Sequence, residues 1–539
     1  MHTFSRTAFL DELDGLIPDP NAPHKYKNES LADALTKSDL LGGLRDQYEL
    51  PRKRDITGNQ AIPEDELALY FTGNSLGPLA KLSRHYVAEE LDVWSRTGVN
   101  GHFSHASGRP WAAQDECVAR YAAEMVGAKR SEVAVMATLT QNLHTMLSTF
   151  YRPNVPDGIP SPLGHAGTEK RRKIVYEYKA FPSDKYALDS VCLLNGLDPA
   201  QVLVPLRPRD GEASLRTEDI LAVIDALGRS GEGAMIMLGG VQYFTGQLFE
   251  IATIAKAAHA ANMLVGLDLA HAFMNVPLQL HDWGIDWAAW CSYKYASAGP
   301  GGIAGLFVHE RWGKHPIPRP SGWWGHNRAT RFTMPETFDP MSGAAGWQVS
   351  NPSAIDIAIL LGSFETVIEG VKATSSDNAL ALSGIGSDSD TEEREKLEKL
   401  GCGRIMPILR LKSMRLTAYL ELLLGPEGFN LESMGVKLCL ITPEDPEQRG
   451  SQLCIQFLDN ASQAEPHKTG STDQVARFMG KDTLLAKVME LIEKERGVLV
   501  DIRYPDVLRM APLAQFSTYM DVYHACEALA WALGQLQSV

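Results

Sequence analysis

A lysine that ends an apolar run is the residue of this chain best placed to do chemistry. Lys294 lies between Tyr293 and Tyr295, and a loop of small residues follows at 296–302. Ammonium groups resist burial unless they are paired or neutralised, and burial favours the neutral amine. A neutral amine suits Schiff-base formation with a carbonyl cofactor. Taken alone, such a lysine is more often a surface residue at a strand end, so the interpretation depends on its partners.

An acid and a histidine precede this lysine and supply such partners. Asp268 ends another apolar run about 26 positions earlier, and His271 follows it. A carboxylate there is costly unless a cation meets it, and a protonated pyridine nitrogen is such a cation. The carboxylate would keep the ring cationic, so that the ring acts as an electron sink. The plainer alternatives are a helix N-cap for Asp268 and ordinary packing for His271.

Two further segments place polar residues directly after expected strands. Thr140 opens an expected helix, where backbone N–H groups and a hydroxyl can hold a phosphate, although an N-cap is the commoner role. Phe181 would stack on a planar ring, and Asp184 would join the ring-nitrogen site. Their alternatives are a core phenylalanine and an N-cap. Lysine, acid, stacking ring and phosphate cradle together predict pyridoxal phosphate as the cofactor.

Three more residues are candidates for ligand contacts or subunit contacts. Arg509 lies in an apolar run, where a guanidinium needs an anion, either a substrate carboxylate or an internal acid. Trp323 belongs to a glycine-bracketed aromatic pair suited to a ligand wall or a subunit interface. His102 lies in a glycine-rich loop. Loop packing and a surface histidine are the alternatives for the last two.

Apolar strands and helices alternate along the segments that carry these residues. We expect strands at 133–137, 173–176, 234–238 and 263–268, with a helix at 251–261. Near-continuous apolar strands separated by helices predict an α/β fold with a mostly parallel sheet. Such sheets bind ligands beyond the carboxyl ends of their strands, so we expect the site there.

The length of 539 residues predicts more than one domain. We expect an N-terminal arm over 1–65, a large cofactor-binding domain over 66–345 and a smaller C-terminal α+β domain over 346–539. In the last, helices are expected at 354–369, 408–424 and 519–536, and strands at 453–457 and 498–503. Loop-like inserts are expected at 154–172 and 372–390, with a charged helix starting at 391.

Composition narrows the class of protein. The net charge of −15 disfavours nucleic-acid or anionic-membrane binding as the main function. Seven scattered cysteines without a C-x-x-C pair match neither a disulfide framework nor a metal site. We find no signal peptide and no apolar stretch of about 18 residues, so a cytoplasmic protein is the expectation.

These segments together resemble the kynureninases, pyridoxal-phosphate enzymes of the aminotransferase-like fold (fold type I). The resemblance runs from about Tyr70 to the C-terminal region. It depends on residues 70–77, 109–111, 139–140, 142–144, 181–184, 243–247, 268–272, 291–294, 322–326 and 350–352.

The resemblance implies hydrolysis of L-kynurenine or 3-hydroxy-L-kynurenine to an anthranilate and L-alanine, a Cβ–Cγ cleavage of tryptophan catabolism and NAD biosynthesis. Lys294 would bind the cofactor covalently and move the α-proton, Asp268 would hold the ring nitrogen, and Tyr293 would act as an acid or only bind phosphate. The other cofactor contacts that it implies are Leu139, Thr140, Phe181, Pro182, Ser183, Asp184, His271, Trp323 and Asn351. The substrate contacts that it implies are Ser75, His102, Asn351 and Arg509.

The resemblance also implies a homodimer with shared sites, in which Trp323 and Asn351 reach the neighbouring subunit. One position departs from the family pattern: Gly239 stands where some relatives carry serine, so a cofactor contact there needs the backbone. Two other functions stay open. One is a cysteine desulfurase or class V aminotransferase, where a desulfurase needs a mobile cysteine such as Cys402. The other is a non-catalytic protein built on the same fold.

Overall fold

The computed structural model describes residues 4–155, 159–163, 170–313, 315–373, 405–459 and 483–537. Part of the expected insert at 154–172 and nearly all of that at 372–390 lie outside the described residues. The charged helix expected from 391 and Cys402 lie outside them as well.

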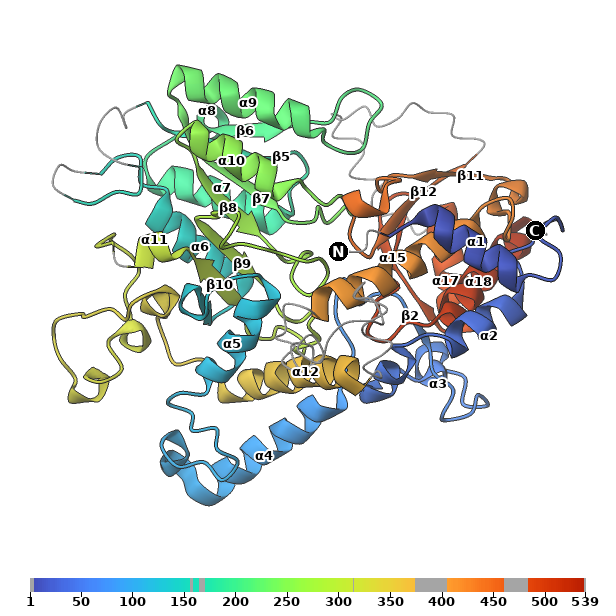
Figure 1. Ribbon diagram of the computed structural model, residues 1–539, viewed down its shortest axis with the longest axis horizontal. Helices are drawn as coiled ribbons and strands as arrows, with labels where there is room; N and C mark the ends of the chain where they lie inside the picture. Colours follow the sequence, from blue (N-terminus) through green and yellow to red (C-terminus); the bar gives the residue numbers. More distant parts are fainter. Residues whose placement is uncertain are drawn as a thin grey trace, which may run out of the picture.

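A seven-stranded sheet forms the centre of the larger half of the molecule (Figure 1). Its order is β4-β10-β9-β8-β7-β5-β6, and the five strands from β9 to β6 run parallel while β10 is antiparallel to both neighbours. The predicted mostly parallel sheet and its four expected strands are confirmed. The strands are β4 (Val133–Val135), β5 (Lys173–Glu177), β6 (Leu203–Leu206), β7 (Gly233–Gly239), β8 (Leu264–Asp268), β9 (Trp287–Trp290) and β10 (Gly305–Val308).

Helices cover both faces of this sheet because its strands are apolar on both sides. Along β7, Met235 and Met237 belong to one core cluster, and Ile236 and Leu238 belong to another. The first core includes side chains of α6 (Leu139–Phe150) and α7 (Pro182–Leu194), and the second includes those of α9 (Thr217–Ser230) and α10 (Ile251–Ala260). Burial on both faces explains why the strands read as continuous apolar runs.

The smaller half contains a four-stranded sheet and three long helices (Figure 1). The sheet order β11-β12-β15-β14 is antiparallel throughout. Its strands are β11 (Val436–Leu440), β12 (Leu453–Asp459), β14 (Asp501–Arg503) and β15 (Val507–Met510). Its helices are α15 (Ile405–Leu424), α17 (Leu484–Arg496) and α18 (Tyr519–Gln537). The helices expected at 408–424 and 519–536 are confirmed as α15 and α18, and α17 was not expected.

The strand expected at 498–503 is wrong in one respect. The structure divides it into β13 (Val498–Leu499), which pairs in parallel with β2 (Leu69–Tyr70), and β14, which pairs with β15. The chain changes sheets at Val500. An apolar run does not reveal such a change, because both pieces are extended.

The N-terminal residues pack on the smaller half. Phe9 and Leu13 of α1 (Arg6–Leu16) and Leu31 of α2 (Glu29–Lys37) share a core cluster with α15 and α18. By contrast, α12 (Ala354–Ala373) packs against α4 (Lys81–Thr97) and α5 (Asp115–Met125) of the larger half. The short elements β1 (Tyr48–Glu49), α3 (Lys53–Thr57), β3 (Leu79–Ala80), α8 (Pro199–Val202) and α11 (Glu310–Gly313) complete the described helices and strands.

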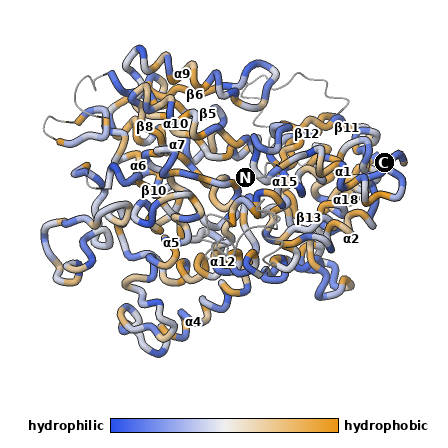
Figure 2. The backbone as a smooth tube through the Cα atoms, viewed as in Figure 1, coloured by the Kyte–Doolittle hydropathy of each residue, from blue (hydrophilic) through white to orange (hydrophobic). Residues whose placement is uncertain are grey.

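Figure 2 shows hydrophobic residues gathered on the elements inside each half and hydrophilic residues along the outer loops. In the described part of the chain, no helix combines the length and the apolar character needed to cross a bilayer.

Candidate active site

A cavity of about 340 Å³ opens where three neighbouring strands of the large sheet end. The last residues of β5, β7 and β8 line it, namely Glu177, Gly239 and Asp268. This is the carboxyl edge at which we expected the site. The other lining residues are Asn74, Ser75, Thr138, Leu139, Thr140, Phe181, Ser183, Asp184, Val241, Tyr243, Ala270, His271, Tyr293, Lys294, Gly301, Gly302, Arg503 and Arg509.

The lysine lies in this cavity beside a neutral histidine. Lys294 Nζ donates to His271 Nε2 at 3.0 Å, and His271 Nδ1 lies 3.1 Å from the Tyr295 hydroxyl. Burial, with the positive charges of Lys294 and Arg509, holds the pKa of His271 well below its ordinary value. The imidazole therefore stays uncharged and accepts a hydrogen bond from the lysine amine. The lysine is partly buried, so it is not the surface residue of the plainer alternative.

Two buried carboxyl groups face each other at the ends of β8 and α7. Burial raises the pKa of Asp184 well above its ordinary value, and the charge of Asp268 and a hydrogen bond between the two groups raise it further. Burial also raises the pKa of Asp268, but the bond from Asp184 and the Ala270 N–H, 2.7 Å from Asp268 Oδ1, oppose that rise. These effects favour a proton on Asp184 and the negative charge on Asp268.

The acid pair lacks a permanent cation. Among the described residues, neither Asp184 nor Asp268 forms an ion pair with a lysine, arginine or histidine, although the charge of Lys294 favours ionisation of both. Asp184 Oδ1 is also buried without a hydrogen-bond partner. Buried carboxylates normally have a cationic or donor partner, so this pair is suited to a ligand that supplies one, such as a protonated ring nitrogen.

The N-termini of α6 and α7 meet at another wall of the cavity. Thr138 is the N-cap of α6, so Thr140 lies inside the first turn and its hydroxyl instead contacts the Ser183 hydroxyl at 2.8 Å. Phe181 is the N-cap residue of α7 and makes no side-chain capping bond. The first N–H groups of a helix lack intrahelical partners and attract anions. Both helices therefore direct donors towards one place, which is suited to a phosphate.

Phe181 is not a core residue, as the plainer alternative required. Its side chain is 45% exposed and packs edge-on against Tyr243, with ring centroids 5.3 Å apart. Lys294 Nζ lies 6.0 Å from the centre of its ring. A flat ligand joined to the lysine amine would thus lie within reach of the phenyl ring. The amine, the carboxyl pair, the phenyl ring and the paired helix ends fit pyridoxal phosphate.

Two arginines from the sheet of the smaller half share one acid at the cavity. Asp501 lies directly across from Arg509 in the β14–β15 pair and ion-pairs with it, and Asp501 Oδ1 accepts from Arg503 at 2.8 Å. Arg509 also donates to the Tyr243 carbonyl at 2.6 Å, and its Nε is buried without a partner. Arg509 therefore has an internal acid as its partner and also lines the cavity.

Sequence reasoning missed Arg503, Asp501 and Glu177. Asp501 and Arg503 are two residues apart in an expected strand, so they would lie on the same side of the sheet. This spacing was the only indication in the sequence that they belong together. Glu177 ends an expected strand, as Asp268 does, and that position was its signal.

Four of the expected site residues do not line the cavity of a single chain. Pro182 begins α7, and Asn351 is exposed. His102 Nδ1 lies 3.1 Å from the Val99 carbonyl. Trp323 is 43% exposed, and its indole N–H donates to a neighbouring carbonyl. The structure brings Ser75, Arg509 and the remaining expected residues together.

The backbone of Gly239 is already engaged. Because glycine has no side chain, a cofactor contact at this position would need the backbone. The Gly239 N–H already donates to Glu177 Oε2 at 2.8 Å, so it is not available for that contact. The lining residues of the cavity do not include any of the cysteines that the structure describes, which are Cys117, Cys192, Cys291, Cys439, Cys454 and Cys526.

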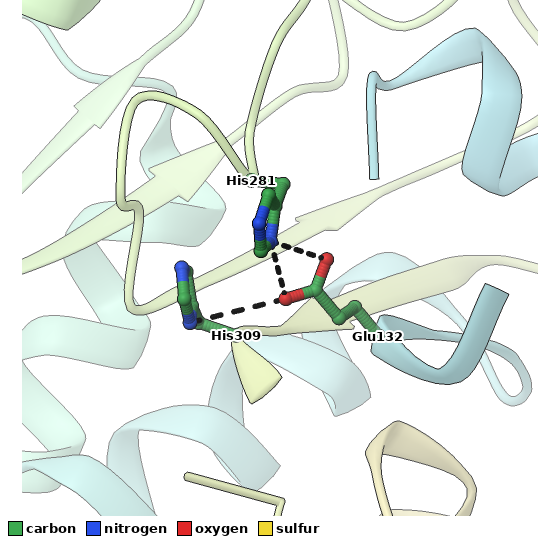
Figure 3. Close-up of side chains that lie close together, drawn as sticks. All are labelled: Glu132, His281 and His309. Atoms are coloured by element: carbon green, nitrogen blue, oxygen red, sulfur yellow. Dashed lines mark hydrogen bonds and ion pairs between the residues drawn. The ribbon is translucent and has the colours of Figure 1, made fainter. Parts of the chain in front are cut away.

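Outside the cavity, one group of metal-type ligands comes close together in the described part of the chain (Figure 3). His281 Nδ1 donates to Glu132 at 2.9 Å, and the carboxylate also accepts from the N–H groups of Lys129 and Glu310. The rings of His281 and His309 are stacked 5.0 Å apart at 17°. The Glu132 carboxylate is already occupied by these hydrogen bonds, so we interpret the group as a hydrogen-bonded junction.

Comparison with known proteins gives two family matches. Residues 208–322 match the aminotransferase class-V family, and residues 462–529 match the kynureninase C-terminal domain. The chain is 38% identical over 529 residues to kynureninase 2 of Aspergillus niger, covering 95% of this chain and 98% of that one. It is 39% identical to a kynureninase of Myxococcus xanthus, covering 94% and 98%.

Solved structures with the same fold are more distant in sequence. The cysteine desulfurase CsdA of Escherichia coli aligns with a TM-score of 0.58 at 15% identity, over 92% of this chain and 98% of that one. The cystine C–S lyase C-DES aligns with a TM-score of 0.56 at 14% identity, over 86% and 97%. These two likenesses concern the fold alone, whereas the full-length identities above separate this chain from the desulfurases.

Proposed function

The chain belongs to the kynureninase family, and from that premise we propose that the cavity around Lys294 hydrolyses L-kynurenine or 3-hydroxy-L-kynurenine to an anthranilate and L-alanine. The reaction is a pyridoxal-phosphate-dependent cleavage of the Cβ–Cγ bond, in tryptophan catabolism and NAD biosynthesis. The observation that carries the proposal is one cavity that holds the Lys294 amine, the Asp184–Asp268 pair and the Arg509 guanidinium.

Pyridoxal phosphate supplies a carbonyl that joins amines and a ring that accepts electrons from the substrate α-carbon. The N-terminal turns of α6 and α7, with Thr140 and Ser183, would hold its phosphate. Phe181 would stack on its ring, and the Asp268 carboxylate would hold a proton on the ring nitrogen. Asp184, whose protonated form is favoured by burial and by the charge of Asp268, would support that carboxylate with a hydrogen bond.

Proton movement falls to Lys294 and Tyr293. The lysine amine would take the α-proton, and the neutral His271, 3.0 Å away, orients that amine. Burial raises the pKa of Tyr293, so its phenol stays protonated and can donate to the γ-carbonyl oxygen or to the phosphate. Arg509, which lines the cavity, would bind the substrate carboxylate, and Asp501 would hold the guanidinium in place.

A homodimer with shared sites accounts for the residues that one chain leaves outside its cavity. Phe103, which follows His102, contacts Phe332 with ring centroids 5.2 Å apart, and Phe332 contacts Trp323 at 5.3 Å. Phe103, Phe332 and Trp323 are all exposed by more than two fifths in the single chain. An exposed cluster of large aromatic rings is typical of a protein interface. Trp323, Asn351 and His102 would then approach the partner's cavity and choose the aryl group of the substrate.

We place the enzyme in the cytoplasm, on the basis of its seven scattered cysteines and its acidic composition. Its direct partners would be the amino-acid substrate and a second copy of the chain.

Lys294→Ala tests the proposal. The variant, given pyridoxal phosphate, should lose the visible absorbance of the covalently bound cofactor and all kynurenine cleavage. Lys185→Ala is a matched control, because Lys185 lies on α7 and pairs with Asp189 outside the cavity lining. Cleavage of kynurenine by Lys294→Ala would refute the assignment. Alanine release from cysteine but not from kynurenine, in the unmodified enzyme, would favour a desulfurase instead.

A further inference from the structure

Glu177 is a buried carboxyl group at the cavity to which the reaction above gives no role. It ends β5, is only 4% exposed, and lines the same cavity as Asp184 and Asp268. Among the described residues it forms no ion pair with a lysine or arginine. Within the described part of the chain, its side chain accepts one hydrogen bond, from the Gly239 N–H at 2.8 Å from Oε2. Burying an acid with so little neutralisation costs free energy, and acids in such surroundings are frequent at functional sites. The burial of Glu177 therefore points to a function in this site.

The bond to Gly239 connects Glu177 to the backbone of Asp268. Gly239 is the last residue of β7 and pairs with Asp268 in the parallel β7–β8 register. The next residue, Gly240, donates its N–H to the Asp268 carbonyl at 2.9 Å. Glu177 therefore fixes the end of β7, and the end of β7 fixes the peptide that carries the Asp268 side chain.

The absence of a side chain at Gly239 leaves room for this arrangement. A Cβ built at position 239 would lie 3.3 Å from Glu177 Oε1 and 3.5 Å from Oε2, which is a tight approach. The carboxylate thus occupies the space that a side chain at 239 would otherwise fill.

We propose that Glu177 is a positioning residue for Asp268, which holds the end of β7 and sets the negative charge around the ring-nitrogen site. This inference depends on the proposed function, because it assigns Glu177 to the same cofactor site. The ionisation of Glu177 would add one negative charge beside the Asp184–Asp268 pair.

The surroundings of Glu177 place that change near neutral pH. Burial raises the pKa of Glu177 to about 7, and the charge of Asp268 contributes, whereas the Gly239 N–H opposes the rise. The other charged or titratable groups at the cavity are Asp184, Tyr243, His271, Tyr293, Lys294, Arg503 and Arg509. Glu177 in turn raises the pKa values of Asp184 and Tyr243.

The test compares cofactor binding by three full-length proteins at pH 6 and pH 8: the unmodified enzyme, Glu177→Gln and Glu132→Gln. Glutamine keeps the acceptor for Gly239 and removes the ionisation. Glu132 is a matched control, because it is a buried glutamate that accepts backbone N–H groups outside the cavity. The readouts are the dissociation constant of pyridoxal phosphate from the apoenzyme and the absorbance of the bound cofactor against pH.

One added charge near an ionisable site changes its equilibrium about tenfold, or about one pH unit. The unmodified enzyme and Glu132→Gln should therefore show a pH-dependent affinity and an absorbance transition near pH 7 that Glu177→Gln lacks or shifts by about one unit. Identical curves for Glu177→Gln and the unmodified enzyme would overturn the inference. An unmodified enzyme that binds the cofactor covalently but does not cleave kynurenine would contradict the proposed function instead, and the binding curves would still decide the role of Glu177.

Discussion

Replacing Glu177 by glutamine is expected to change how the stability of the cofactor-free protein depends on pH. An acid whose pKa is higher in the native state binds a proton that the unfolded chain has released, so its stabilising contribution is lost as pH rises. For Glu177 the two values are about 7 in the native protein and 4.5 ordinarily. The contribution is complete below pH 4.5 and is lost as pH rises through about 7.

The size of this loss in unfolding free energy depends on how much of the range between the two pKa values an experiment can cover. Each pH unit is worth about 1.36 kcal/mol, and about 1.5 units separate pH 5.5 from pH 7. The unmodified apoenzyme should therefore lose about 2 kcal/mol of unfolding free energy between pH 5.5 and pH 8 that Glu177→Gln retains. Effects of the substitution that do not depend on pH cancel in this comparison.

Urea unfolding of both apoenzymes, at several pH values between about 5.5 and 8, measures the difference. The dependence of unfolding free energy on urea should be equal in the two proteins, which verifies that they unfold from comparable native states. Stability curves that run parallel across this range would show that Glu177 is already ionised at pH 5.5, and would refute the reasoning from burial.

Three further substitutions test other parts of the structure. Asp268→Asn removes the anion expected at the ring nitrogen, so turnover should fall about a hundredfold or more while the melting temperature is kept; near-normal steady-state rates would contradict the electron-sink role. Asp501→Asn removes the carboxylate that orients Arg509, so KM for kynurenine should rise about tenfold with a smaller change in kcat, and an unchanged KM would exclude that support. Glu132→Ala leaves the N–H groups of Lys129 and Glu310 without their acceptor, so calorimetry should show a loss of about 2–3 kcal/mol, while turnover at 25 °C is kept.

The strands of the large sheet could be predicted from the sequence because their burial is symmetrical. Residues 234–238 were expected as a strand, and β7 spans Gly233–Gly239. A strand covered on both faces is apolar at every position, so it differs clearly from the amphipathic helices around it. The expected segment 498–503 had the same appearance, yet it divides between two sheets. Pairing partners decide that division, and they lie more than four hundred residues away for β13 and only a few residues away for β14.

Individual residues of the site could be identified from the sequence. The choice between a role in the site and a purely structural role needed the structure. Thr140 had the sequence of an N-cap, but Thr138 takes that position and leaves the Thr140 hydroxyl for the cavity. Arg509 had two possible partners, a ligand or an internal acid, and the β14–β15 register provides Asp501 without closing the arginine off from the cavity. For Thr140, a difference of two residues in the start of the helix decides the role of the hydroxyl. For Arg509, a difference of one residue in the strand register would change its partner.

The charge of the three carboxyl groups at the cavity could not be predicted from any one segment of the sequence, because the three residues belong to three different elements. Glu177 ends β5, Asp184 lies in the first turn of α7, and Asp268 ends β8. Each residue alone has an ordinary explanation as a capping or strand-end acid. Only their common burial makes their ionisations depend on one another, since three like charges in one desolvated cavity are costly. Which carboxyl group keeps a proton is therefore a property of the folded sheet edge, and the pH dependence of cofactor binding is the measurement in which that property becomes visible.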